Sequence, residues 1–373
     1  MKRKIIYICN IVISLLLYPF FKLFYKHQKT IIMFGFGNDY YENNIRFLYE
    51  YYTNKMQDKY DIYAVFGKDS KQKQFIKNNL LLRGKIKTYL LFYISKAIIF
   101  DTCNNDIAPG IQRFWKKSKK IFLTHGMEGL KNVDFLFNNT KTIKADLSFA
   151  ASEYEKNIRN KFGLFENTVV TGYPRFDFYN YADTVDKKIV ILFTWRKYLS
   201  EDKLEESLYF QKVKEFLLNQ DFINFLHEKN VKCYVKIHHK VINNIKIFNV
   251  DSNLIISQDF DFSKVLSESS LLITDYSSLA WDFIYYDKPV IFYQFDKEEY
   301  EEKSGKLYTN IENEKIGFSL KNINDIKNIL NKCYDEARNC FAIQQIDNKT
   351  KFFNYIDNNN TQRVVQTIED FLL

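Results

Sequence analysis

The stretch that most constrains the fold is residues 271–291, where two apolar runs enclose a hydroxyl-rich turn. Residues 271–273 form a short apolar run of the kind that lies inside a parallel sheet. A cluster of hydroxyl and carboxyl side chains follows directly: Thr274, Asp275, Ser277 and Ser278. Residues 279–286 then predict a helix, and residues 290–293 predict the next buried strand.

This strand–turn–helix pattern is typical of an anion site. Hydroxyl groups and free backbone N–H groups at a helix N-terminus favour phosphate, because the helix dipole adds to their attraction. The turn also follows the carboxyl end of a strand, where open α/β sheets bind ligands. The spacing alone is equally compatible with an ordinary capped helix.

The same alternation of buried strands and helices recurs along the chain. Further strands are predicted at residues 30–37, 61–66, 97–100, 120–123, 189–193, 233–238 and 253–257. Residues 179–188 are polar and short, and they form the best candidate linker. The pattern predicts an α/β fold with two Rossmann-like domains facing a cleft, at residues 29–184 and 185–373, preceded by a hydrophobic segment at 1–28.

The composition is that of a folded protein with anionic partners. The 373 residues are 46% hydrophobic and 27% charged, which excludes a disordered chain. The net charge of +9 favours phosphorylated polymers, nucleotides or acidic lipid headgroups. No zinc-finger spacing, aromatic sheet motif or basic tail indicates nucleic acid. The five cysteines lie far apart, which favours reduced thiols in a cytoplasmic protein over a disulfide or zinc framework.

Two strand ends carry candidates for catalysis or anion binding. His125 and Gly126 follow the strand at 120–123, although a lone histidine is more often structural. Arg196 follows the strand at 189–193, where a guanidinium facing the cleft can hold phosphate through a fork of hydrogen bonds. A salt bridge that closes the domains is the alternative for Arg196.

A third strand ends in His238 and His239. On an extended chain these two side chains point in opposite directions, so they are not predicted to form a metal site. Arg175 lies in the turn that closes the first domain. It could contact phosphate, but a structural role at the domain border is the stronger interpretation.

The motifs between residues 274 and 296 resemble those of the CDP-glycerol glycerophosphotransferase family. They are Thr274-Asp-Tyr-Ser-Ser278, Trp281-Asp-Phe283, Asp287-Lys-Pro-Val-Ile291 and Tyr293-Gln-Phe-Asp296. The His-Gly pair at 125–126, completed by Leu130 and Lys131, is similar to a second family signature. The chain departs from the family where Glu128 and His239 each replace a proline.

The resemblance covers roughly residues 31–318 and implies a GT-B-type arrangement, with the donor on the C-terminal half. It implies transfer of a polyol phosphate from a CDP-activated donor to a hydroxyl acceptor, with release of CMP. His125 would be the general base, and His238 and Arg196 would balance the charge of the diphosphate. Asp275 would orient the polyol or a histidine.

The hydroxyl groups expected to hold phosphate oxygens are those of Thr274, Ser277 and Ser278. Secondary candidates are Gly126, Lys131, Glu153, Arg175 and Asp282. The expected partners are CDP-glycerol or CDP-ribitol, a lipid-linked or polymeric acceptor and the cytoplasmic membrane surface, but not nucleic acid. We expect no metal site and no tightly bound cofactor.

Two other functions stay open at this point. A glycosyltransferase of the same fold would use a nucleotide sugar. An inactive scaffold would bind anionic polymer at the membrane, although the intact His125, His238 and residues 274–278 weigh against it.

Residues 1–28 are predicted to associate with a membrane. A basic start precedes residues 5–21, which carry no charge and include Pro19 near their end. A full span needs about 20 apolar residues, so an interfacial helix, a transmembrane helix and a buried helix are all compatible with this length. We expect the interfacial anchor, because nucleotide donors are cytoplasmic and the catalytic body must meet them.

Overall fold

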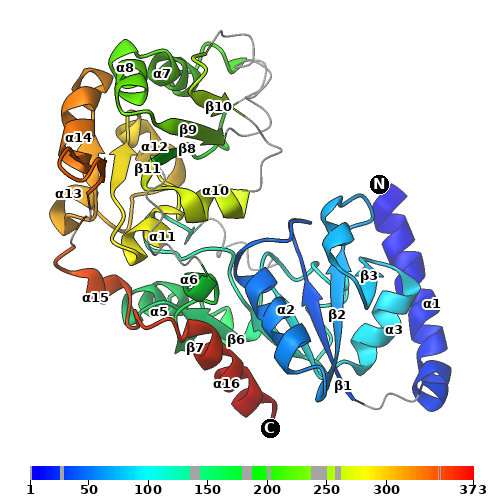
Figure 1. Ribbon diagram of the computed structural model, residues 1–373. Coiled ribbons are helices and arrows are strands. Elements are labelled where there is room, and N and C mark those ends of the chain that lie inside the picture. Colours follow the sequence, from blue (N-terminus) through cyan, green and yellow to red (C-terminus); the bar gives the residue numbers. More distant parts are fainter. Residues whose placement is uncertain are drawn as a thin grey trace. The chain divides into compact units, whose positions relative to one another are not determined.

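The computed structural model describes residues 2–25, 29–134, 143–178, 187–199, 203–236, 250–256, 262–342, 344 and 346–373 (Figure 1). The chain divides into two compact units. Unit 1 comprises Met1–Met127, Val133–Phe178 and Thr350–Leu373, and unit 2 comprises Glu128–Asn132 and Tyr179–Lys349.

Unit 1 contains a seven-stranded parallel sheet in the described part of the chain, in the order β3–β2–β1–β4–β5–β6–β7. This is the doubly wound Rossmann order extended by one strand, and it reverses between β1 and β4. The strands are β1 (Thr30–Gly35), β2 (Tyr60–Phe66), β3 (Leu80–Leu82), β4 (Ala97–Phe100), β5 (Lys119–Phe122), β6 (Ala145–Ala150) and β7 (Phe165–Val170). The helices are α1 (Lys2–Phe24), α2 (Asn43–Lys55), η1 (Gln72–Phe75), α3 (Ile86–Ile94), α5 (Glu153–Asn160), α6 (Arg175–Phe178) and α16 (Asn360–Leu372).

Unit 2 repeats the plan: its described residues form a six-stranded parallel sheet in the order β10–β9–β8–β11–β12–β13. Its order reverses between β8 and β11. The strands are β8 (Lys188–Leu192), β9 (Lys232–Lys236), β10 (Leu254–Ile256), β11 (Leu271–Thr274), β12 (Val290–Tyr293) and β13 (Phe318–Leu320), with a small hairpin of β14 (Tyr334–Asp335) and β15 (Cys340–Phe341). The helices are α7 (Leu208–Leu217), α8 (Gln220–Glu228), α10 (Phe262–Glu268), α11 (Ala280–Tyr285), α12 (Lys297–Ser304), α13 (Ile311–Glu314), η3 (Ile323–Asp325) and α14 (Ile326–Cys333), and α15 (Lys349–Phe352) leads out of the unit.

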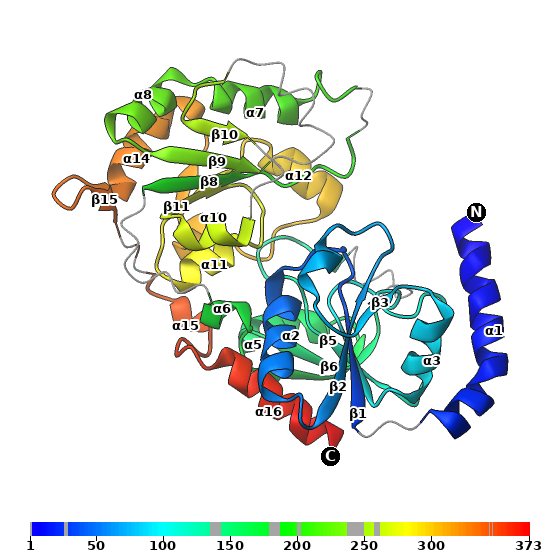
Figure 2. The same ribbon diagram turned by 45° about the vertical axis from the view of Figure 1, so that its right-hand side comes forward.

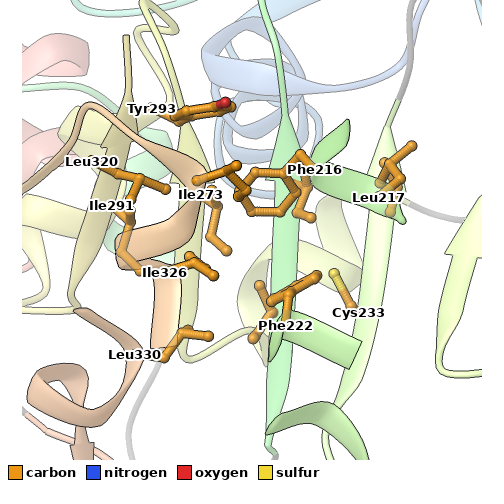
Figure 3. Close-up of a cluster of buried hydrophobic side chains, with 14 of the residues drawn as sticks. Phe216, Leu217, Phe222, Cys233, Ile273, Ile291, Tyr293, Leu320, Ile326 and Leu330 are labelled. Atoms are coloured by element: carbon orange, nitrogen blue, oxygen red, sulfur yellow. The ribbon is translucent and has the colours of Figure 1, made fainter. Parts of the chain in front are cut away.

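The core of unit 2 explains why its strands are continuous apolar runs. Helices α7, α8 and α14 place Phe216, Phe222 and Leu330 against one face of the sheet (Figure 3). Ile273 and Ile291 meet them from the neighbouring strands β11 and β12. Because helices cover a parallel sheet, its central strands lose their exposed face and carry few polar residues. The predicted strands at 189–193 and 271–273 are present for this reason.

Helix α1 lies beside α3 in both views (Figures 1 and 2). One face of α1 packs against the rest of unit 1. Ser14 Oγ and Tyr93 Oη lie 2.9 Å apart, Asn10 Nδ2 donates to the Gly84 carbonyl at 2.9 Å, and the Tyr18 ring packs edge-on against Tyr93. The opposite face is apolar and exposed, and the helix is long and apolar enough to cross a membrane. Only 6% of its most apolar window is buried, which excludes the buried-helix alternative.

The unit boundaries differ from the expected ones in two places. The C-terminal helix α16 belongs to unit 1, not to the domain predicted at 185–373. Its apolar face packs against α2 and α6, and the Asp177 carboxylate accepts hydrogen bonds from the backbone N–H groups of Asn360 and Thr361 at the start of the helix. The second difference is the short segment Glu128–Asn132, which belongs to unit 2.

Candidate functional site

The strand ends of β8 and β11 carry a buried ionic network in unit 2. Asp275 follows β11 and accepts hydrogen bonds from the backbone N–H of Thr194 at 2.9 and 3.1 Å. Arg196 Nη1 donates to Asp275 Oδ2 at 2.8 Å. On its other side Arg196 donates to both oxygens of Asp296, through Nε at 2.7 Å and Nη2 at 2.8 Å. One guanidinium therefore joins the loops that follow three strands.

Aromatic rings enclose this network. The guanidinium of Arg196 lies 4.8 Å from the centre of the Tyr276 ring and 5.0 Å from that of Tyr300, and these two rings stack on each other. Burial alone would lower the pKa of Arg196, but Asp275 and Asp296 outweigh it and raise the pKa. Arg196 is 1% exposed and uses its donors internally. This pairing favours the salt-bridge alternative, here within unit 2, and the phosphate-clamp role of Arg196 stays a prediction.

The predicted phosphate hydroxyls fall into two groups. Thr274 is buried, and its hydroxyl donates to the Leu192 carbonyl at 2.6 Å, which ties β11 to β8. Ser277 and Ser278 are half-buried in the turn before α11. Ser277 Oγ accepts a hydrogen bond from the Leu279 N–H at 3.2 Å. Only the two serines thus combine the predicted place in the turn with access to solvent.

The segment Glu128–Asn132 brings a lysine to the same unit. Its backbone is held by hydrogen bonds from Tyr308 N to the Leu130 carbonyl at 3.0 Å and from the Thr309 hydroxyl to the Gly129 carbonyl. Desolvation lowers the pKa of Lys131, Asp275 opposes this effect, and Lys197 adds to it. Lys131 therefore lies within electrostatic reach of the network around Asp275. The sequence indicated Lys131 only as a secondary candidate, and it gave no role to Asp296 or Lys197.

His125 lies in unit 1, in the loop that follows β5. Its side chain is exposed, and the backbone carbonyls of His125 and of the residue before it both accept hydrogen bonds from side chains. Arg175 Nη1 donates to the His125 carbonyl at 2.8 Å, and Asn44 Nδ2 donates to the preceding Thr124 carbonyl at 2.7 Å. Arg175 is buried and holds this loop, in keeping with the structural interpretation. Gly126 is buried next to His125 and donates its N–H to the Thr124 hydroxyl.

The remaining predicted site residues are Glu153, Asp282 and His238. Glu153 is the exposed first residue of α5 and lies 3.5 Å from Lys156. Asp282 is buried inside α11. His238 lies outside the described residues, so the structure does not place it beside the others. Among the residues that are described, no group of three His, Cys, Asp or Glu side chains is close enough to hold a metal ion.

A cavity of about 580 Å³ in unit 2 adjoins the ionic network. It is lined by Gln294, Asp296 and Lys297 at the end of β12, and by Asn310 and Lys321 near β13. Gln294 Nε2 also donates to the Asp275 carbonyl at 3.1 Å. The volume lies within the range of about 300–1,000 Å³ that is usual for small-molecule sites.

Comparison with known sequences connects these features to one family. The profile of the CDP-Glycerol:Poly(glycerophosphate) glycerophosphotransferase family matches residues 16–370. The chain is 26% identical over 377 residues to the minor teichoic acid biosynthesis protein GgaB of Bacillus subtilis (strain 168), covering 92% of this chain but only 40% of GgaB. It is 26% identical over 395 residues to the teichoic acid glycerol-phosphate transferase of Staphylococcus aureus (strain NCTC 8325 / PS 47), covering 94% of this chain and 96% of that protein.

Comparison with solved structures establishes the fold. The wall teichoic acid polymerase TagF superposes with a TM-score of 0.70 at 19% identity, over 100% of this chain and 97% of that one. A variant of TagF was soaked with CDPG. The likeness confirms the predicted α/β fold with two Rossmann-like domains of the GT-B type.

Proposed function

Since the chain belongs to the CDP-glycerol:poly(glycerophosphate) glycerophosphotransferase family, we propose that it transfers glycerol phosphate or ribitol phosphate from the CDP-activated donor to a hydroxyl acceptor in a teichoic-acid-like or capsular polymer. CMP is the leaving product. The observation that carries this proposal is the turn after β11. There the buried pair of Asp275 and Arg196 fixes the backbone, and Ser277 and Ser278 stay accessible beside it.

In this proposal the donor binds to unit 2. Phosphoryl transfer depends mainly on positioning and on neutralising charge. Ser277 and Ser278 donate hydrogen bonds to phosphate oxygens, and Lys131 supplies the positive charge that Arg196, already paired with two carboxylates, does not. The nucleoside occupies the cavity next to Asp296, whose size suits a small molecule.

His125 is the general base of the proposed reaction. An imidazole can take the hydroxyl proton near neutral pH, as the acceptor oxygen attacks the β-phosphorus and the bond to the CMP oxygen breaks. The exposed side chain on a fixed backbone suits this role. His238 remains a proposed second cation for the diphosphate.

We also propose that α1 anchors the protein in the membrane interface, on the cytoplasmic side, without crossing it. Its docked face makes polar contacts with the rest of unit 1 through Asn10 and Ser14. Directly after the helix, the Tyr25 hydroxyl lies 3.2 Å from that of Tyr63. A transmembrane helix would have to give up these contacts. The opposite face exposes large apolar side chains, including Leu16 and Phe20, as an interfacial helix does.

A donor panel tests the proposed reaction. The full-length protein is incubated with membrane extract as acceptor and with CDP-glycerol, CDP-ribitol or UDP-sugars, and the nucleotide products are separated. We expect CMP from at least one CDP-polyol and no UDP from any sugar donor. Release of UDP would favour the nucleotide-sugar alternative, and binding of polymer without turnover of any donor would favour the inactive scaffold.

A further inference from the structure

Unit 1 contains a cavity of about 520 Å³ that the proposed transfer reaction does not use. One wall is formed by the first turns of α1, with Tyr7, Ile8 and Ile11. The other wall is formed by loops at the carboxyl ends of the strands, including Cys103 and Pro109. All of these residues belong to unit 1, so the cavity is complete within that unit.

The cavity lies where a doubly wound sheet is expected to bind a ligand. The strand order of unit 1 reverses between β1 and β4, and open α/β sheets bind ligands beyond the carboxyl ends of the strands at such a reversal. The loops that line the cavity follow these two strands: Gly37 follows β1, and Cys103 and Asp106 follow β4. Side chains of α1 complete the lining of the cavity.

The polar groups in the strand-end wall already have partners within the protein. The Asp106 carboxylate accepts hydrogen bonds from the N–H groups of Thr102 and Cys103 at 2.8 and 2.9 Å. Arg83 pairs with Asp39 at 2.9 Å and donates to the Asp106 carbonyl. This wall therefore offers few hydrogen bonds to a ligand, and the part of a ligand that enters must be largely apolar.

The α1 wall of the cavity approaches the neighbouring loop closely at Tyr7, and at Ile8 it continues into the exposed apolar face of the helix. Gly84 has a positive φ of 75°, and a Cβ at this position would lie 2.2 Å from the Tyr7 ring, so glycine allows the Tyr7 ring to approach this closely. Ile8 lines the cavity and is also 61% exposed, which joins the cavity to the exposed apolar face of α1. Lys4 lines the cavity at the N-terminal end of the helix and adds a positive charge.

We propose that this cavity binds a single-chain anionic amphiphile from the membrane, with its hydrocarbon chain between α1 and the strand-end loops and its anionic head beside Lys4. The cavity is continuous with the exposed apolar face of α1, and the inference rests on the proposed anchoring of this face in the membrane, which selects a membrane molecule. Lys4 selects an anionic head. The inference goes beyond the transfer reaction, and it can be tested without a nucleotide donor.

The test uses dodecyl phosphate as the probe, at concentrations below its micelle threshold, with binding to the full-length protein measured by calorimetry. Ile8→Glu places a charge in the cavity, and Leu16→Glu places the same charge on the exposed face of the same helix, outside the cavity. Because Ile8→Glu removes apolar contact and places a charge against the hydrocarbon chain, it is expected to weaken binding at least about tenfold. Leu16→Glu is expected to leave it unchanged, and both variants should weaken binding to anionic vesicles.

A second pair of variants tests the head group. Lys4→Gln is expected to weaken binding of dodecyl phosphate several-fold and to leave binding of uncharged dodecyl maltoside unchanged, whereas Lys22→Gln should affect neither. Circular dichroism shows whether each variant keeps its fold. Equal effects of Ile8→Glu and Leu16→Glu would overturn the proposal, as would binding to vesicles without binding to the monomeric probe. A dimer that Ile8→Glu dissociates would assign the cavity to a second copy of the chain instead.

Discussion

Both units have a buried aspartate at the point where their strand order reverses. In unit 2 this aspartate is paired with an arginine, whereas in unit 1 it lies near another carboxyl group. In unit 2, Asp275 after β11 accepts the backbone N–H of Thr194 after β8. In unit 1, Asp101 after β4 accepts the backbone N–H of Gly37 after β1, at 3.1 Å. In both sheets a carboxylate thus fixes the loop of the neighbouring strand at the edge where ligands bind.

The difference lies in what neutralises the carboxylate. Asp275 is paired with the buried guanidinium of Arg196. Asp101 lies near a second buried carboxyl group, Asp106, and burial followed by this repulsion raises the pKa of Asp101 to about 7. Burial likewise raises the pKa of Asp106 to about 6. The edge of unit 2 therefore holds charged groups that are paired with one another, whereas the edge of unit 1 favours neutral groups and adjoins an apolar cavity.

The largest effect on stability is expected from Arg196→Met. This change leaves Asp275 and Asp296 buried without their cation, which typically costs about 3–5 kcal/mol. The free energy of unfolding in urea measures the loss. Arg83→Met is the matched change in unit 1, and its partner Asp39 is one-third exposed, so the loss there should be clearly smaller. Equal losses would contradict the contrast between the two edges.

A smaller effect is expected from Gly37→Ala. A Cβ at this position would lie 2.5 Å from Thr102 Cβ and 2.6 Å from Asp106 Oδ2. Overpacking of this kind costs about 1–3 kcal/mol. The mirror change in unit 2 is Thr194→Ala, which keeps the N–H that Asp275 accepts and should cost less than Gly37→Ala. The urea midpoints of the two variants measure the difference in cost. A larger cost for Thr194→Ala than for Gly37→Ala would contradict the prediction that the tight packing at Gly37 decides the loss.

The last expected effect is spread over several pH units: it is a pH dependence of stability that originates in unit 1. Because the pKa of Asp101 is about 7 in the folded protein and 3.8 in the unfolded chain, the folded state binds more protons between these values. Stability therefore falls as pH rises through this window, by up to about 1.4 kcal/mol per pH unit for one proton. Asp101→Asn mimics the protonated form and should flatten the curve of urea midpoint against pH from 5 to 7. A slope unchanged by Asp101→Asn would show that another group is responsible.

Much of the fold was predictable because it depends on local patterns. Strands such as β8 and β11 are apolar runs, and the turn at 274–278 lies where the hydroxyl cluster placed it. The role of Arg196 was not predictable from local sequence. Its partners Asp275 and Asp296 lie 79 and 100 residues away, and only the folded sheet brings them together.

The assignment of two segments to the unit other than the expected one was also not predictable from their order in the sequence. A boundary drawn at the linker assigns Glu128–Asn132 to the first domain, although its carbonyls bond to Tyr308 and Thr309 in unit 2. The return of α16 to unit 1 likewise depends on a cap by Asp177, which lies 183 residues before Asn360. Neither segment carries a local signal for its distant partner.

The most direct test of the central claim separates catalysis from donor binding in one variant. His125→Ala removes the proposed base and leaves the donor-binding unit intact. We expect the rate of CMP release from the accepted CDP-polyol to fall by about 10²–10⁴, with the Kd for that donor nearly unchanged. An unchanged rate, or a loss of donor binding that accounts for the whole decrease, would contradict the assignment of His125 as the base.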